Sequence, residues 1–275
     1  VTTPFDIITA NNTGSQVFTK VAPGAYSVTE TVPAGWDLTN RTCVNTGDGA
    51  HAFTTPTNGI GVTLAAGEDV TCTFTNTKQG QIKVIKNTIG GNDDFAFTSN
   101  FNLGTITTTP TSGNNGQGIK VISGLTPGSG YQLAETPVPA GWQITTGLSC
   151  KLDDGQGAAT GTGSGTPVNS VTGITVEPGK ITTCTITNTK KASLEVRKEC
   201  SPDDAENTFD FAWTKGGAGQ TGFTLGCSNQ GGANKRVLIS PTVDSASVGN
   251  ITYVITEGQL PSGWSFDGEI GRAHV

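Results

Sequence analysis

Six cysteines and a recurring glutamate are the residues whose types and spacing could support chemistry in this sequence. Two cysteine pairs occupy equivalent positions: one member follows a Gly-Trp sequence and the other lies in a later Thr-rich segment. Thiols that recur together at matching positions predict disulfides, and disulfides indicate an oxidising compartment. The predicted bonds are Cys43–Cys72 and Cys150–Cys184. Cys200 and Cys227 form a third pair at different positions, for which cysteines further downstream in a longer protein are alternative partners.

The glutamate belongs to a repeated signature, Y-x-x-x-E followed by P-x-G-W. The tyrosines lie roughly 100 residues or more apart, so the repeating unit has the size of a small domain. The tyrosine, glutamate and tryptophan of the three copies are Tyr26, Glu30 and Trp36; Tyr131, Glu135 and Trp142; and Tyr253, Glu257 and Trp264.

Alternation of side chains places a polar residue at the end of several apolar strand faces. Successive strand residues point to opposite faces, so residues two apart share a face. If the apolar faces point inward, each polar residue is buried and needs a hydrogen-bonding partner. In the middle repeat the sets are Ile82, Val84 and Lys86; Tyr131, Leu133 and Glu135; and Cys184, Ile186 and Asn188.

Short strands joined by turns are the elements expected to position these residues. The chain has 39 glycines, 33% hydrophobic and 14% charged residues, and no sustained apolar spacing at helical period. We therefore expect an all-β protein. A net charge of −6 argues against nucleic-acid binding, and no apolar run reaches membrane-spanning length.

A second repeat predicts the module boundaries. Residues 73–78 and 185–190 resemble one another and are each followed by a similar strand, at 81–86 and 193–198, as if one module ended and the next began. An acidic–aromatic segment follows each opening strand, at 93–97 and 209–213. The predicted modules are 1–78, which lacks its first strand, 79–190, which is complete, and 191–268, which is truncated at its C-terminal end. Residues 269–275 match what codons of a sequencing adapter would encode, and we exclude them as an artefact.

Taken in their order along the chain, these motifs resemble Cna-B-type modules, which are the SpaA-like, prealbumin-like domains of bacterial surface proteins and pilins. A lysine ending the first strand, the Y-x-x-x-E…P-x-G-W signature and a closing strand with asparagine carry the resemblance over nearly the whole chain. The resemblance implies tandem immunoglobulin-like β-sandwich modules at the bacterial cell surface, outside the cell.

The resemblance also implies a cross-link, because many such modules join a lysine to an asparagine in an intramolecular isopeptide bond promoted by an acidic residue. The middle module offers Lys86, Asn188 and the promoting Glu135. Burial favours the neutral form of a lysine, which is a nucleophile. A buried glutamate can polarise the carboxamide of the asparagine. Attack of the lysine amine on that carboxamide then expels ammonia. The alternative interpretation makes Lys86 an ordinary strand-end lysine, Glu135 a turn cap and Asn188 a linker residue. Lys83 is a rival nucleophile, but alternation points it to the opposite face.

Two functions remain open from the sequence. The first is a structural stalk whose partners are neighbouring modules of the same chain, since the repeats share framework residues and no aromatic or charged patch recurs outside them. The alternative is an adhesin that binds a host or matrix protein or a glycan. We expect no enzyme and no cofactor, because no Ser-His-Asp set or carboxylate pair recurs. A metal site is not expected either, because no C-x-x-C motif is present and His51 is the one histidine outside the tail.

Overall fold

The computed structural model describes residues 4–46, 49–192, 194–200, 207–226, 236–239 and 252–265. Within these ranges the regular secondary structure consists of strands and one three-residue 3-10 helix, η1 (Asp153–Gly155), so the prediction of an all-β protein is confirmed. No helix in the described ranges has the length and apolar character needed to cross a membrane. Cys227 and the tail predicted at 269–275 lie outside the described residues.

The described sheets are each built from one region of the sequence. No sheet mixes strands from residues 24–78, 80–190 and 194–257. Contacts between residues divide the chain into two compact units, one formed by 1–80 with 123–127 and 177–179, the other by the remaining residues. The module limits given by the repeats stay predictions.

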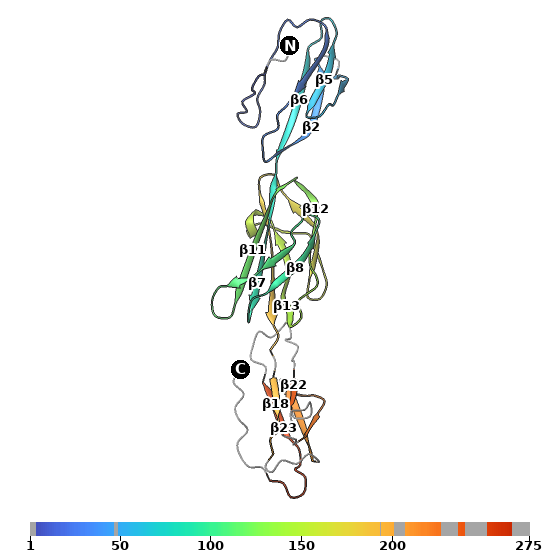
Figure 1. The fold of residues 1–275 in the computed structure, drawn as a ribbon. Coiled ribbons are helices and arrows are strands. Elements are labelled where there is room, and N and C mark those ends of the chain that lie inside the picture. The colour runs from blue at the N-terminus through green and yellow to red at the C-terminus, as the bar shows by residue number, and fades with distance from the viewer. Residues whose placement is uncertain are drawn as a thin grey trace. The chain divides into compact units, whose positions relative to one another are not determined.

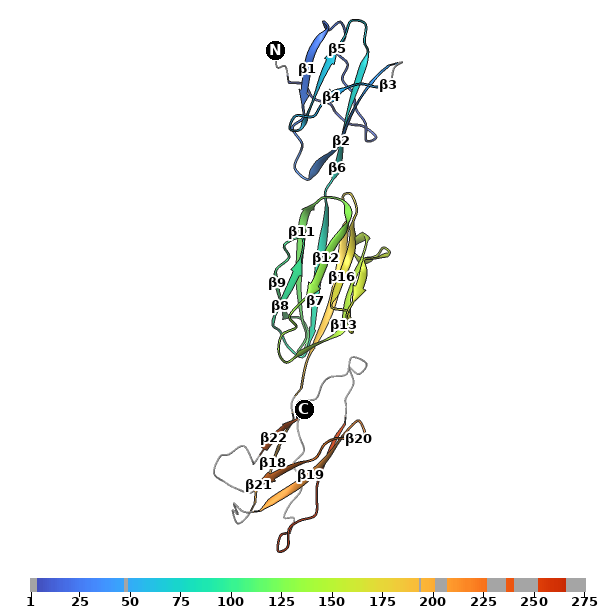
Figure 2. The same ribbon diagram turned by 90° about the vertical axis from the view of Figure 1, so that its right-hand side faces the viewer.

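Residues 80–190 form a two-layered sandwich (Figures 1 and 2). One sheet has six strands in the order β10-β11-β7-β17-β13-β14, and the other has five in the order β15-β16-β12-β8-β9. The strands are β7 (Gly80–Ile89), β8 (Asp94–Ser99), β9 (Thr105–Thr107), β10 (Thr109–Pro110), β11 (Gly116–Leu125), β12 (Gly128–Glu135), β13 (Trp142–Lys151), β14 (Ala159–Thr160), β15 (Thr162–Ser164), β16 (Ser170–Val176) and β17 (Ile181–Lys190).

The first and last strands of this sandwich, β7 and β17, run parallel and side by side. Along β7 buried and half-buried residues alternate, as expected for a strand with one face on the core. β17 lies between β7 and β13 and is buried along most of its length. The core between the sheets is made by apolar side chains that include Ile82, Val84, Phe95, Leu133, Ile174 and Ile186.

Residues 24–78 form two three-stranded sheets, in the orders β1-β5-β4 and β3-β2-β6. Their strands are β1 (Gly24–Thr29), β2 (Trp36–Asn45), β3 (Gly49–Ala50), β4 (Phe53–Thr54), β5 (Gly59–Leu64) and β6 (Val70–Lys78).

Residues 194–257 pair β18 with β22, while β19 pairs with β20, β21 and β23. These strands are β18 (Leu194–Arg197), β19 (Thr208–Lys215), β20 (Ala218–Gly219), β21 (Phe223–Gly226), β22 (Arg236–Ile239) and β23 (Tyr253–Glu257).

The P-x-G-W motif forms the same tight turn in all three regions. The tryptophan N–H donates to the proline carbonyl three residues earlier, at 3.2, 3.1 and 3.2 Å for Trp36, Trp142 and Trp264. The intervening glycines, Gly35, Gly141 and Gly263, have φ of 82°, 80° and 87°. This left-handed backbone at the third position of a turn favours glycine, because a Cβ is strained there.

Replacing Gly141 tests this constraint alone, because a Cβ built at Gly141 meets no atom within 4 Å. Gly141→Ala is expected to lower the free energy of unfolding by about 1 kcal/mol through backbone strain. Gly141→Asn is the matched control and should cost less, because asparagine tolerates the left-handed region better. Urea unfolding of both variants measures the difference, and an alanine variant as stable as the parent protein would contradict the account.

Candidate functional site

Lys86, Glu135 and Asn188 meet in the core of the sandwich formed by residues 80–190. β7 carries Lys86, β17 carries Asn188, and Glu135 is the last residue of β12 in the facing sheet. All three residues are 0% exposed. In the parallel pairing of β7 with β17, Lys86 lies opposite Ile186, two residues before Asn188. Residues two apart share a strand face, so the lysine and asparagine point into the same part of the core.

The carboxylate of Glu135 contacts both other side chains. Lys86 Nζ donates to Glu135 Oε2 at 2.9 Å, and Asn188 Nδ2 donates to Glu135 Oε1. Asn188 Oδ1 is buried and has no hydrogen-bond partner in the structure. One carboxylate therefore connects the amine of the lysine with the carboxamide nitrogen of the asparagine.

Burial changes the acid–base behaviour of Lys86. Loss of hydration disfavours the ammonium form and lowers the pKa of Lys86 to about 8, although the attraction of Glu135 acts in the opposite direction. The neutral amine, which is the nucleophilic form of lysine, is therefore accessible nearer to neutral pH than in water.

Phe95, on β8, is a member of this site that the sequence interpretation missed. Its ring centroid lies 4.2 Å from Lys86 Nζ, a cation–π contact that supports the buried ammonium. Phe209 has the same relation to Lys198, also at 4.2 Å. Aligning the two acidic–aromatic segments by their shared sequence D-F-A would make Phe211, rather than Phe209, the counterpart of Phe95. Strand register corrects the match by two residues, because Phe97 and Phe211 are the residues that lie opposite the signature glutamates.

Trp142 of the P-x-G-W turn also packs against Phe95. The two rings meet edge to face with centroids 5.2 Å apart, and Trp142 is 3% exposed. Its indole N–H donates to Asp93 Oδ2 at 2.8 Å. The backbone N–H of Asp94 and this indole N–H lower the pKa of Asp93. The tryptophan thus packs in the core and frames the site.

Lys83 lies on the opposite side of β7 from the site. Its ammonium pairs with Asp154, whose pKa is lowered by the hydrogen bonds from Lys83 and Thr183. Alternation along β7 therefore separates the two lysines, and only Lys86 reaches Glu135.

Disulfides lie at both pairs of equivalent cysteines. Cys150 and Cys184 join β13 to β17, and Cys43 and Cys72 join β2 to β6, in each case at directly opposed positions. Cys200 is also disulfide-bonded. Its predicted partner lies outside the described residues, so that pairing stays a prediction.

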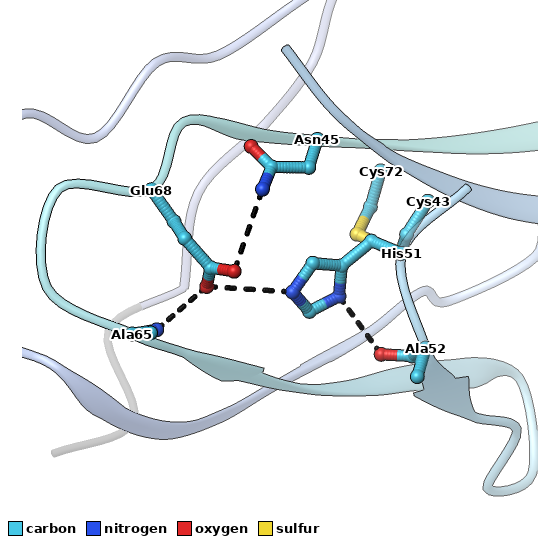
Figure 3. A network of polar contacts seen from close by, with 7 residues as sticks. All are labelled: Cys43, Asn45, His51, Ala52, Ala65, Glu68 and Cys72. Carbon is cyan, nitrogen blue, oxygen red and sulfur yellow. Dashed lines mark hydrogen bonds and ion pairs between the residues drawn. A yellow bond between two sulfur atoms is a disulfide. The ribbon is translucent and has the colours of Figure 1, made fainter. Parts of the chain in front are cut away.

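A second polar cluster lies beside the Cys43–Cys72 disulfide (Figure 3). Glu68 accepts a hydrogen bond from the backbone N–H of Ala65 at 2.6 Å, which lowers its pKa, and its Oε2 lies 3.4 Å from His51 Nε2. The other ring nitrogen of His51 lies 2.9 Å from the Ala52 carbonyl oxygen. These contacts brace the turn between β5 and β6. In the part of the chain that the structure describes, no three His, Cys, Asp or Glu residues are grouped to hold a metal ion.

A family model described as a prealbumin-like fold domain, of the SpaA type, matches residues 1–78 and 82–190. The chain belongs to this SpaA-like family. Membership confirms the resemblance and the fold class, tandem prealbumin-like β-sandwich modules, that the sequence motifs predicted. A comparison with curated proteins finds no match.

Two solved structures are similar to this SpaA-like chain. A streptococcal ancillary pilin is 12% identical with a TM-score of 0.24, covering 84% of this chain and 86% of the pilin chain. Two B repeat units of the collagen binding protein of Staphylococcus aureus are 10% identical with a TM-score of 0.21, covering 82% and 88%. Similarity at this level carries no argument about function.

The lowered pKa of Lys86 predicts that stability depends on pH when the lysine cannot react. Asn188→Ala removes the carboxamide and leaves Lys86 next to Glu135. Because the pKa of Lys86 is about 8 in the folded protein and 10.5 ordinarily, the unfolded state binds more protons between these values. The free energy of unfolding should therefore rise with pH in this window, by a total on the order of 3 kcal/mol.

Urea unfolding of the Asn188→Ala variant between pH 8 and 10 measures this rise. The control adds Lys86→Met and Glu135→Gln, which remove both ionisable groups from the core and should flatten the pH dependence. An equally steep rise in the control would show that other groups cause it.

Proposed function

We propose that this chain is a stalk segment of a bacterial cell-surface protein, and that Lys86 and Asn188 become joined by an isopeptide bond that Glu135 promotes. One observation carries the proposal: a single buried carboxylate contacts both the lysine ammonium and the asparagine carboxamide. Family membership and the disulfides, which form in oxidising compartments, support a location outside the cell.

The contacts suggest a proton path for the reaction. Glu135 accepts a proton from Lys86 Nζ through Oε2, and the neutral amine attacks Asn188 Cγ. The Nζ–Cγ bond forms as the Cγ–Nδ2 bond breaks, and a proton returned through Oε1 lets Nδ2 leave as ammonia. Of the two protons that Nζ loses, one leaves with the ammonia and the other remains on Glu135. The reaction occurs once, within the chain, and needs no cofactor.

The position of the bond suits a protein that carries tension. β7 and β17 are the first and last strands of residues 80–190, so a pull on the two ends of this region loads these neighbouring strands first. A covalent bond between them would carry the load past the roughly 100 residues between Lys86 and Asn188. The partners we assign are therefore the adjoining modules of the same protein.

Intact-mass measurement of the reduced full chain tests the isopeptide directly. The mass should be lower than that of the unmodified sequence by one ammonia, and fragmentation should place the loss at Lys86 and Asn188. Glu135→Ala and Glu135→Gln should both restore the full mass, because neither side chain can transfer the proton. Lys83→Ala is the matched control and should keep the loss. A parent protein with its full unmodified mass would refute the proposal.

Single-molecule stretching tests the load-bearing role. With the disulfides reduced, Glu135→Ala should lengthen the total unfolding extension of the chain by about 350 Å, in a step that releases the roughly 100 residues between Lys86 and Asn188 at the extended length per residue. The parent protein should lack this step because the bond shields that segment. Identical extension in both proteins would contradict a load-bearing cross-link.

A further inference from the structure

The carboxamide oxygen of Asn188 lacks a hydrogen-bond donor in the site that holds Lys86 and Glu135. Both oxygens of Glu135 are engaged elsewhere, because Oε2 accepts from Lys86 and Oε1 accepts from Asn188 Nδ2. An ionised carboxylate only accepts hydrogen bonds, so Glu135 offers the carboxamide oxygen no donor. Among the residues that the structure describes, Asn188 Oδ1 is buried without a partner.

The same orientation of the carboxamide recurs in residues 24–78. Asn76 Nδ2 donates to Glu30 Oε1. Asn188 makes the corresponding contact with Glu135. In both places the glutamate binds the carboxamide nitrogen and leaves the carboxamide oxygen to another group. A donor for Asn188 Oδ1 therefore has to come from a different residue.

Thr88 is the polar residue next to Asn188 in the sheet. Asn188 lies between two directly opposed residues, Ile144 on β13 and Thr88 on β7. The side chain of Ile144 is hydrocarbon, whereas the hydroxyl of Thr88 can donate one hydrogen bond. Thr88 comes two residues after Lys86, so both side chains lie on the buried face of β7.

The hydroxyl of Thr88 is itself buried and unpartnered. Thr88 is 2% exposed, and its Oγ1 has no hydrogen-bond partner within the described ranges. A buried hydroxyl without a partner destabilises a folded protein, and valine has nearly the same shape without that cost. Packing alone therefore gives no reason for a threonine at this position.

The hydroxyl can reach Asn188 by a side-chain rotation. Thr88 Oγ1 lies on the β11 side of β7, because a Cβ built at Gly116 of β11 would come within 2.7 Å of it. Asn188 is on β17, at the other edge of β7. Rotation about χ1 to another staggered position carries the hydroxyl from the β11 side to the β17 side. The glycine at 116 leaves room beside Thr88 for this rotation.

We propose that Thr88 is a further catalytic residue, whose hydroxyl donates to Asn188 Oδ1 while the amine of Lys86 attacks the carboxamide. This role rests on the isopeptide bond of the proposed function. Glu135 moves protons between the two nitrogens, and Thr88 stabilises the oxygen that Glu135 does not contact.

The electron balance shows why the oxygen needs a donor. As the bond from Lys86 Nζ to Asn188 Cγ forms, the electron pair of the carbonyl π bond moves onto Oδ1, which becomes negatively charged. The pair returns to re-form the carbonyl when the Cγ–Nδ2 bond breaks and Nδ2 leaves as ammonia. A hydroxyl directed at this charge in a core without water stabilises the intermediate, and the hydroxyl keeps its proton throughout.

The rate of ammonia loss in the full chain tests this role. Cell-free synthesis is stopped after a short pulse, and aliquots quenched in acid and urea at increasing times are reduced and weighed by mass spectrometry. Thr88→Val should slow the loss by at least about tenfold, because removing one donor to a developing oxyanion costs on the order of 10²–10³ in rate. Thr88→Ser keeps the hydroxyl and should recover most of the rate.

Two controls separate catalysis from packing. Thr185→Val makes the same replacement on the outer face of β17 and should react at the parent rate. Stability is compared in chains that carry Asn188→Ala and cannot react. There Thr88→Val should not lower the free energy of unfolding in urea, because it removes an unsatisfied hydroxyl. A clear loss of stability would assign Thr88 a packing role and overturn the proposal.

Two kinetic results would also overturn the role of Thr88. These are a Thr88→Val chain that loses ammonia at the parent rate, and a Thr88→Ser chain as slow as the valine variant. Either result leaves the isopeptide bond standing, because the parent chain still loses ammonia. A parent chain that loses no ammonia refutes the proposed function and the role of Thr88 with it.

The reacted chain gives an independent geometric test. In its crystal structure Thr88 Oγ1 should lie about 2.8 Å from the carbonyl oxygen of the isopeptide. A Thr88 hydroxyl still turned toward Gly116, with the isopeptide oxygen bound by another donor, would contradict the proposal.

Discussion

The need of a buried ammonium for a counterion organises residues 80–190. Moving a lysine ammonium from water into a protein core costs several kcal/mol, and a partner offsets this cost only at close range and good geometry. Glu135 supplies the charge and Phe95 supplies a ring face, and both come from the sheet opposite Lys86. The contact therefore constrains how the two sheets face one another, and it brings the carboxamide of Asn188 to the same carboxylate.

β17, the last strand of residues 80–190, makes stabilising contacts with both neighbouring strands and with the facing sheet. β17 is tied to β13 by a disulfide, pairs with β7 along its length, and reaches the facing sheet through Asn188. β6 has the corresponding disulfide and glutamate contact but no described strand along its other edge. The comparison separates what the disulfide provides from what the lysine strand provides. The disulfide holds two strands of one sheet together, whereas β7, the strand that carries Lys86, covers the core and completes the polar contacts.

Local rules predicted much of this fold and site. Side-chain alternation placed Lys86, Glu135 and Asn188 on inward faces, and it separated Lys83 from them. Matching cysteine positions predicted the strand pairs that are joined. The role of Phe95 was not predictable in this way, because letter matching shifted the acidic–aromatic repeat by two residues and only pairing with the glutamate strand gives the register. The division of hydrogen bonds between the two oxygens of Glu135 depends on how the sheets stack, which no local pattern encodes.

The central claim is that Glu135 brings Lys86 and Asn188 together in order to join them. A crystal structure of the full chain at atomic resolution tests it most directly. The account predicts continuous electron density between Lys86 Nζ and Asn188 Cγ, with Glu135 in hydrogen-bond contact with the new amide. Separate density for a free lysine amine and an intact asparagine carboxamide would contradict it.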